Sequence, residues 1–304
     1  MLEIIRETCP SCGSERLVIN KNFFCDWEGL SEEMYLVICP KCNLGFFNKI
    51  LTEKDIEDLY SDDNYFQSEW CWFGKPYQEV WRERKKEFED KQLGWIKKLK
   101  VSGKVLDIGC GGGAIVKAFN DASYNAMGVD LNENLSEFGR SNLGVDIVNI
   151  DVIDEKSLKK FGQFDLLYMA DFLEHINEPR IFLQSISNIL RDDGLVVIDV
   201  PLFELNRFSS RVMYFYTKLR NKRIRFKAKP YHLIFFRPNS LVRLCSNAGY
   251  KVKTLKTWKE NILKKDDYRK KSLRYNMSNW LDHILPKLFG KYFNDRAFIV
   301  LEKA

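Results

Sequence analysis

The chain has 304 residues, of which 45% are hydrophobic, 14% aromatic and 30% charged, and its formal net charge is +6 at pH 7. This composition is typical of a globular protein and excludes a disordered, collagen-like or low-complexity chain. No apolar run approaches the roughly 18 residues of a membrane span, and the N-terminus lacks the basic start and apolar core of a secretory signal. We therefore expect a cytoplasmic protein.

Two cysteine pairs lie near the N-terminus, Cys9 and Cys12 in "CPSCGS" and Cys39 and Cys42 in "CPKCNL". Two thiolates of one tight turn can occupy adjacent corners of a tetrahedron around Zn²⁺, and two such turns complete a closed structural site. Redox chemistry needs only one such pair, so the presence of two pairs argues against a redox role. The pattern resembles a zinc ribbon and predicts a small zinc-binding domain over residues 1–50, with Cys25 in its core.

Residues 51–102 are expected to form a helical linker or cap. The stretch "TEKDIEDLY" opens on Thr52, which resembles the first residue of a capping box. A charged, amphipathic stretch, "YQEVWRERKKEFEDKQLGWIKKLK", then runs toward Gly103. We predict that this stretch is helical.

From residue 103 to residue 304 the chain alternates short apolar β-rich runs with helical segments. This alternation predicts a doubly wound α/β fold, with a mostly parallel sheet covered by helices on both faces. Two insertions interrupt it, at residues 203–230 and 259–294. The stretch from Arg207 to Lys229 carries nine Lys or Arg and no Asp or Glu, which favours an anionic partner.

The stretch "VLDIGCGGGAIV" reads as a strand, a glycine-rich turn and a helix, which is the layout of a nucleotide-binding site. Gly109, Gly111 and Ala114 fit G-x-G-x-x-G/A, and Asp130 follows about 20 residues later, so the spacing alone leaves a dinucleotide site open. Asp107 distinguishes a dinucleotide site from a site for a cationic ligand. A carboxylate there would repel two phosphates, whereas it would attract the ammonium and sulfonium groups of S-adenosylmethionine.

The sequence "VLDIGCGGG" followed by "GVD" resembles the first two motifs of the class I S-adenosylmethionine-dependent methyltransferases, over roughly residues 103–304. The resemblance implies a Rossmann-like sheet of seven strands. It also implies that Gly109 and Gly111 let the cofactor approach the backbone and that Asp130 accepts from both ribose hydroxyls. Asp107 would face the cationic end of the cofactor.

The same resemblance assigns four further cofactor contacts. Leu131 would form an apolar wall for the adenine, and Asp151, at the expected end of the third strand, would accept from its amino group. The backbone amide of Val152 would lie near the adenine ring. Ala170, at the end of the fourth strand, would lie beneath the methionine part.

The stretch "FDLLYMADFLEHINEP" resembles the fourth motif of the family, which faces the methyl acceptor. A base is needed for a hydroxyl acceptor, so Asp171, His175 and His232 are the candidate catalytic residues, although His175 can also serve only to orient the loop. Together with Glu174 they resemble the Mg²⁺ or Mn²⁺ ligands of metal-dependent ubiquinone-pathway and small-RNA O-methyltransferases. Those enzymes prefer Glu where this chain has Asp171.

A zinc-binding segment before such a core resembles bacterial sugar C- and O-methyltransferases. The resemblance implies an acceptor hydroxyl or carbon on a sugar, a nucleotide-linked sugar or a related small metabolite, with Tyr60, Tyr65 and Phe66 at the pocket rim. The basic insertion would hold a diphosphate. Alternatives are an RNA acceptor, a lipid-linked acceptor reached through "FSSRVMYFYTKLRNKR" lying on a membrane, and a scaffold without chemistry.

Overall fold

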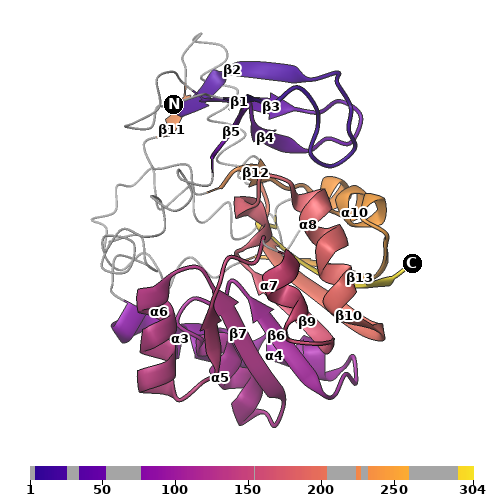
Figure 1. Cartoon of the computed structure of the whole chain (residues 1–304). Coiled ribbons are helices and arrows are strands. Elements are labelled where there is room, and N and C mark those ends of the chain that lie inside the picture. The colour runs from indigo at the N-terminus through magenta and orange to yellow at the C-terminus, as the bar shows by residue number, and fades with distance from the viewer. Residues whose placement is uncertain are drawn as a thin grey trace.

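The computed structural model describes residues 4–25, 34–52, 77–153, 155–203, 224–226, 232–259 and 294–304. Tyr60, Tyr65, Phe66 and most of both insertions lie outside these ranges, as does the side chain of Cys25. We call residues 4–25 and 34–52 the ribbon. In Figure 1 the ribbon lies above a larger body that contains a seven-stranded sheet. Among the described residues, no helix is both long and apolar enough to cross a membrane.

The seven-stranded sheet has the strand order β13-β14-β10-β9-β6-β7-β8. The strands β6 to β10 are mutually parallel, and β14 is antiparallel to both of its neighbours. This arrangement confirms the predicted doubly wound fold. The strands are β6 (Lys104–Ile108), β7 (Asn125–Asp130), β8 (Ile147–Asn149), β9 (Phe164–Ala170), β10 (Leu190–Pro201), β13 (Tyr250–Trp258) and β14 (Arg296–Lys303).

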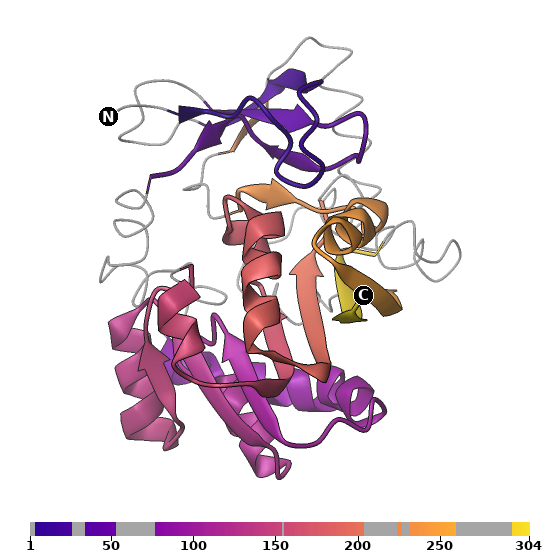
Figure 2. The same ribbon diagram turned by 45° about the vertical axis from the view of Figure 1, so that its right-hand side comes forward.

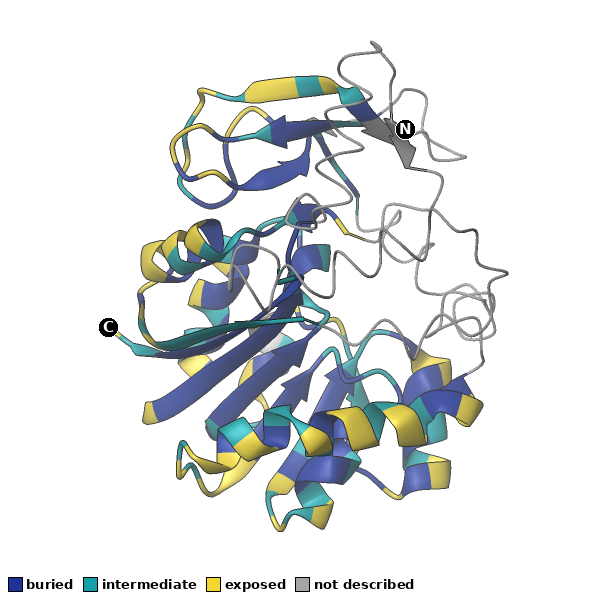
Figure 3. Cartoon of the chain, turned by 180° about the vertical axis from the view of Figure 1, so that it is seen from behind, coloured by how far each residue is buried: buried dark blue, intermediate teal, exposed yellow. Residues whose placement is uncertain are grey.

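Helices cover both faces of this sheet because alternate residues of each strand point to opposite sides. On one face, Leu106 and Ile108 pack in the core that includes α8 and α10, whereas Val105 packs in the core that includes α3, α4 and α5. Figure 3 shows the strands buried between helices with exposed outer surfaces. The helices are α3 (Tyr77–Asp90), α4 (Gln92–Lys97), α5 (Ala114–Asp121), α6 (Glu133–Phe138), α7 (Glu155–Lys159), α8 (Pro179–Ile186) and α10 (Pro238–Asn247).

Two predicted elements differ in the structure. The stretch expected to be helical forms two helices, α3 and α4, divided at Lys91, whose φ of −135° and ψ of −73° are not helical and whose ammonium lies 3.8 Å from the centre of the Trp258 ring. The third strand was expected to reach Asp151, but β8 ends at Asn149. The Asp151 carboxylate accepts a hydrogen bond from the amide of Ile153, which makes a local turn instead of a strand.

The ribbon is built from β2 (Val18–Cys25), β3 (Met34–Ile38) and β4 (Gly45–Phe47), with β1 (Ile4–Ile5) paired to β5 (Lys49–Ile50). Two strands from much later in the chain complete its five-stranded sheet. β12 (Ile234–Phe235) is antiparallel to β4, and β11 (Ile224–Phe226) is parallel to β2. The residues expected to form a separate domain therefore share their sheet with the C-terminal half of the chain.

The ribbon and the large sheet also share one hydrophobic core. Phe46, Phe47 and Leu51 of the ribbon belong to the same cluster of buried apolar residues as Leu202 and Leu233. Figure 2 shows β12 between the ribbon and the helices of the large body. Burial of such side chains contributes about 1.5 to 3 kcal/mol each, so packing as well as strand pairing holds the ribbon on this side of the large sheet.

Candidate active site

The glycine-rich loop joins β6 to α5 in a conformation that depends on its glycines. Gly109 and Gly111 have φ values of 72° and 54°, in the left-handed region that favours glycine. A Cβ on Gly109 would lie 2.3 Å from the ring of Phe172. The amide of Ala114, at the start of α5, donates a hydrogen bond of 3.1 Å to the Tyr77 hydroxyl. The loop is therefore fixed by its own geometry and by α3.

Asp107 lies on β6, below this loop, and is 1% exposed. Its Oδ2 atom has no hydrogen-bond partner among the described residues. Burial raises the pKa of Asp107 to about 8, although Arg84 acts to lower it and Asp130 raises it further. A buried carboxylate oxygen that accepts no hydrogen bond is costly unless a ligand supplies a donor, so Asp107 fits the cationic end of S-adenosylmethionine.

Asp130 ends β7 and is oriented by the backbone around it. Its Oδ2 accepts from the amide of Gly111 at 2.7 Å, and its Oδ1 accepts from the amide of Asn132 at 2.9 Å. The side chain of Asn149 donates to the carbonyl oxygens of Asp130 and Leu131. Each carboxylate oxygen keeps a second lone pair, which fits two ribose hydroxyls.

The other predicted cofactor residues lie at the carboxyl ends of neighbouring parallel strands, where open α/β sheets bind ligands. Leu131 directly follows β7, and Ala170 is the last residue of β9. Val152 is buried, whereas Asp151 is exposed beyond the end of β8. The structure therefore brings the predicted cofactor residues to one edge of the sheet.

Asp171 follows β9 with a φ of 53° and pairs with two arginines. Its carboxylate lies 2.7 Å from Nη1 of Arg296 and 3.5 Å from Nη1 of Arg84, and Arg296 also contacts Asp199 at 3.1 Å. Burial raises the pKa of Asp171, but Arg296 and Arg84 outweigh it and hold the pKa well below its usual range. Asp171 is therefore an anion that fixes two cations and a poor acceptor of a proton.

Sequence reasoning missed both arginines, although each had a signal. Arg84 lies on α3 four residues after Val80 and four before Phe88, and both of these are buried. It is thus a cation within the apolar stripe of an amphipathic helix. Arg296 opens strand β14, directly before its apolar run "AFIVL", and is 7% exposed.

Glu174, His175 and His232 converge, and we call them the Glu/His cluster. The Nε2 atoms of His175 and His232 lie 3.8 Å and 3.9 Å from Oε1 of Glu174. One ligand atom from each residue lies within 4.8 Å of the others. Glu174 is 0% exposed, and neither of its carboxylate oxygens has a hydrogen-bond partner among the described residues.

The chemistry of this set fits a divalent cation. Burial raises the pKa of Glu174 well above its usual value, and the nearby Asp171 raises it further, so the carboxylate needs a positive partner to stay ionised. Two imidazoles and one carboxylate are a common set of metal ligands. Asp171, predicted from sequence as a fourth ligand, is instead paired with the arginines described above.

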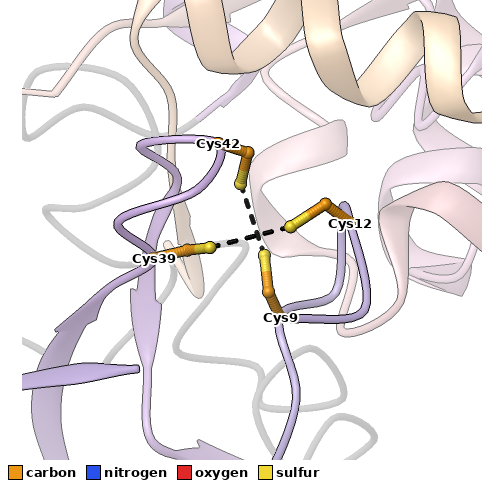
Figure 4. Close-up of side chains that lie close together, drawn as sticks. All are labelled: Cys9, Cys12, Cys39 and Cys42. Atoms are coloured by element: carbon orange, nitrogen blue, oxygen red, sulfur yellow. Dashed lines mark hydrogen bonds between the residues drawn. The ribbon is translucent and has the colours of Figure 1, made fainter. Parts of the chain in front are cut away.

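The four ribbon cysteines form a second cluster, shown in Figure 4. We call each of the two turns that carry a cysteine pair a knuckle, and the sulfur atoms of both knuckles point toward one centre. The Sγ atoms of Cys9 and Cys42 are 3.4 Å apart, and those of Cys12 and Cys39 are 3.7 Å apart. A disulfide requires about 2.05 Å, whereas the edge of a tetrahedron with Zn–S bonds of about 2.3 Å measures about 3.8 Å. The geometry fits the predicted zinc ligands.

Cations surround this cysteine cluster. A cavity of about 290 Å³ beside it is lined by Ser11, Cys12, Lys41, Cys42, Arg180, Arg243 and Asn247. Arg180 belongs to α8 and Arg243 to α10, so both come from the large body. Four thiolates around Zn²⁺ carry a net charge of −2, which these cations would offset.

Comparison with known proteins agrees with this geometry. A family model described as a methyltransferase domain matches residues 78–255, more than half of the chain. The ubiquinone biosynthesis O-methyltransferase of Glaesserella parasuis is 26% identical over 183 residues, covering 57% of this chain and 75% of that protein. The protein of the same name from Aromatoleum aromaticum is 28% identical over 166 residues, covering 52% and 69%.

Among solved structures, a SAM-dependent methyltransferase from Archaeoglobus fulgidus resembles this chain with a TM-score of 0.53 at 20% identity. The match covers 79% of this chain and 100% of that chain, and at such identity it concerns the fold. The family match sets aside the dinucleotide site that the glycine spacing left open. The chain belongs to the methyltransferase domain family and is an S-adenosylmethionine-dependent methyltransferase.

Proposed function

We propose that the enzyme methylates a hydroxyl oxygen of a small-molecule acceptor. The observation that carries this choice of oxygen over carbon is the buried Glu174 carboxylate, which meets two imidazoles where the family places the acceptor. S-adenosylmethionine, when bound, supplies a methyl group already activated by its sulfonium. The chain must then align the acceptor and remove the hydroxyl proton. The relatives named as O-methyltransferases support the same choice.

On the cofactor side, we assign Asp107 to the ammonium group and Asp130 to the ribose hydroxyls. Gly109 and Gly111 would leave space for the cofactor beside the backbone. For the adenine and the methionine part we keep the assignments that the resemblance implies, which are Leu131, Asp151, Val152 and Ala170.

Arg84 is the proposed contact for the carboxylate of the cofactor. It lies within Coulombic range of both Asp107 and Asp171, at the place where the methionine end would lie. Asp171 would then act as a positioning residue that holds Arg84 and Arg296. Its lowered pKa makes it unsuitable as the base.

The Glu/His cluster would hold a divalent cation beside the acceptor. Such a cation, when bound, lowers the pKa of a hydroxyl in contact with it. Glu174 provides the negative charge, and His175 and His232 provide neutral nitrogen donors. His232 is the most accessible of the three, with 47% of its side chain exposed, so it would also face the acceptor.

Removal of divalent cations is expected to abolish methyl transfer, and adding Mn²⁺ should restore it. Of the two cations predicted from sequence, Mn²⁺ suits the two nitrogen donors better than Mg²⁺, which prefers oxygen. The measurement is the rate of transfer from methyl-labelled cofactor after treatment with a mild chelator, with zinc content followed in parallel. Full activity in metal-free buffer would contradict the metal and leave His232, oriented by Glu174, as the base.

For the acceptor we propose a sugar, a nucleotide-linked sugar or a related small metabolite. Labelled cofactor should be incubated with fractionated metabolites, nucleotide sugars, RNA and liposomes, and the labelled product identified. Label on a hydroxyl of a soluble small molecule is the expected result. Label on RNA or on a lipid-linked product would select one of the alternatives, and label on carbon would contradict O-methylation.

We further propose that the ribbon binds one Zn²⁺ through its four cysteines. Metal analysis of the purified chain should give about one zinc per chain. Replacing Cys39 by serine should remove the zinc and lower the free energy of unfolding, because metal binding and folding of such sites are coupled. A Cys245→Ser variant, which changes a buried cysteine of α10 outside the cluster, is the control and should keep its zinc.

A further inference from the structure

The two chain segments that form the Glu/His cluster are both attached to the ribbon. One carries His232, and the other carries Glu174 and His175. His232 lies two residues before β12, the strand that pairs with β4 of the ribbon through the register Ile234 to Phe46 and Phe235 to Gly45. The amide of Phe47 donates to the carbonyl of Leu233 at 3.1 Å, and the amide of Leu233 donates to the carbonyl of Glu174 at 2.8 Å. One residue, Leu233, thus joins the ribbon to Glu174 through its carbonyl and its amide.

The segment that follows Glu174 and His175 is tied to the ribbon a second time. Arg6 contacts the carboxylate of Glu178 at 2.5 Å and donates to the carbonyl of Asn177 at 2.9 Å. The side chain of Asn177 donates in turn to the carbonyl of Leu51 at 2.8 Å. The Arg6 side chain is buried, whereas 42% of the Glu178 side chain is exposed, so this second tie is partly buried.

The cysteine cluster lies close along the chain to the ribbon residues that make these contacts. Gly45, which pairs with Phe235, follows Cys42 by three residues. Two hydrogen bonds close the turn that carries Cys39 and Cys42. The amide of Cys39 donates to the carbonyl of Leu44, and the amide of Asn43 donates to the carbonyl of Cys39. Arg243 of α10 also donates to the carbonyl of Lys41. A zinc ion held by the four sulfurs would therefore fix both the start of β4 and its contact with the large body.

The residues proposed to bind the cofactor, unlike the Glu/His cluster, are held by parts of the large body. The groups that hydrogen-bond to Asp130 and the glycine loop come from α3, from β7 and the backbone after it, and from β8. The Asp107 carboxylate is influenced by Arg84 of α3 and by Asp130. The ribbon thus contacts the acceptor side of the site, while the large body fixes the cofactor side.

We propose that the zinc-bound ribbon positions the Glu/His cluster, so that loss of the ribbon zinc disorders this cluster while cofactor binding is retained. The importance of this positioning for catalysis rests on the proposed function, in which the cluster acts on the acceptor hydroxyl. The positioning of the cluster by the ribbon does not depend on the proposed function. A ribbon that sets the geometry of the acceptor side explains why two strands from the C-terminal half complete its sheet.

Hydrogen exchange of the full chain tests the positioning without an acceptor. Two variants are compared with wild type: Cys42→Ser, which removes a zinc ligand, and Arg6→Met, which removes the second tie but keeps the zinc ligands. Arg16→Met makes the same change at an exposed arginine of the ribbon and is the control. Affinity for S-adenosylmethionine, measured by calorimetry, reports whether the large sheet stays folded.

In Cys42→Ser we expect exchange at Leu233 and in residues 174–178 to rise about tenfold or more, with wild-type exchange in β6 and β7 and an unchanged cofactor affinity. In Arg6→Met only residues 174–178 should lose protection, and Arg16→Met should match wild type. Wild-type exchange at Leu233 in Cys42→Ser would overturn the proposal. Loss of protection throughout, together with loss of cofactor binding, would overturn it as well, because the zinc would then support the whole fold.

Different experiments test the positioning of the cluster by the ribbon and the proposed function. If the cluster loses protection as expected but Glu174→Gln transfers methyl groups at the wild-type rate, the positioning stands and the proposed function fails. If Glu174→Gln is inactive but zinc loss leaves the cluster protected, the proposed function stands and the positioning is wrong.

Discussion

The Glu174→Gln variant is expected to lose methyl transfer by about a hundredfold or more while its affinity for S-adenosylmethionine stays unchanged. Glutamine matches glutamate in shape but carries no negative charge, so the two imidazoles lose the anionic member of the Glu/His cluster. Without metal, folding should suffer little, because neither carboxylate oxygen of Glu174 has a hydrogen-bond partner among the described residues. Turnover, calorimetry with the cofactor and thermal unfolding are the three measurements.

The matched control for this variant is Glu79→Gln, the same change at an exposed position of α3. It should keep wild-type turnover, cofactor affinity and unfolding temperature. Wild-type turnover in Glu174→Gln would show that the carboxylate takes no part in the reaction. A parallel loss of cofactor affinity would mean that the substitution damages the whole site, which would contradict a role confined to the acceptor side.

The placement of the proposed cofactor residues at one edge of the sheet could be predicted from the sequence because their contacts are local. Asp107, Gly109 and Asp130 lie within one strand, one turn and the next strand of a parallel sheet, and the glycine spacing itself determines which amide approaches Asp130. The periodic apolar runs likewise indicated the doubly wound sheet. Patterns of this kind depend on a few neighbouring residues and so can be read from a single chain.

The acceptor half depends on contacts between distant parts of the chain. The resemblance to metal-dependent O-methyltransferases groups Asp171 with the metal ligands, yet its partner Arg296 lies 125 residues away and reaches it because β14 pairs with β10. The pairing of β12 with β4 joins residues separated by more than half of the chain. A strand of two residues has no periodicity to detect, so this pairing could not be predicted from the sequence.

The second large effect is expected at Asp107. Replacing it by asparagine should weaken binding of S-adenosylmethionine by about a hundredfold or more, because the variant keeps the size of the side chain but loses the charge that would pair with the ammonium group in a buried site. Calorimetry measures the loss directly. Asp121→Asn, the same change at the exposed end of α5, should bind as wild type does.

The raised pKa of Asp107, about 8 in the free enzyme, also determines how binding depends on pH. Below this pKa the free carboxyl is mostly protonated, and a cationic ligand binds its ionised form, so binding lowers the pKa and releases a proton. Affinity should therefore increase by up to about tenfold per pH unit from about pH 6 toward pH 8. In Asp107→Asn this rise should disappear.

The same pKa has the opposite consequence for stability without cofactor. The folded chain binds the Asp107 proton more tightly than the unfolded chain, whose carboxyl has the ordinary pKa, so this group lowers the free energy of unfolding as the pH rises from about 4 to about 8. Denaturant titrations across that range should show a weaker fall in Asp107→Asn than in wild type. A variant that binds the cofactor poorly yet follows the wild-type pH dependence of stability would show that Asp107 is not the group that titrates.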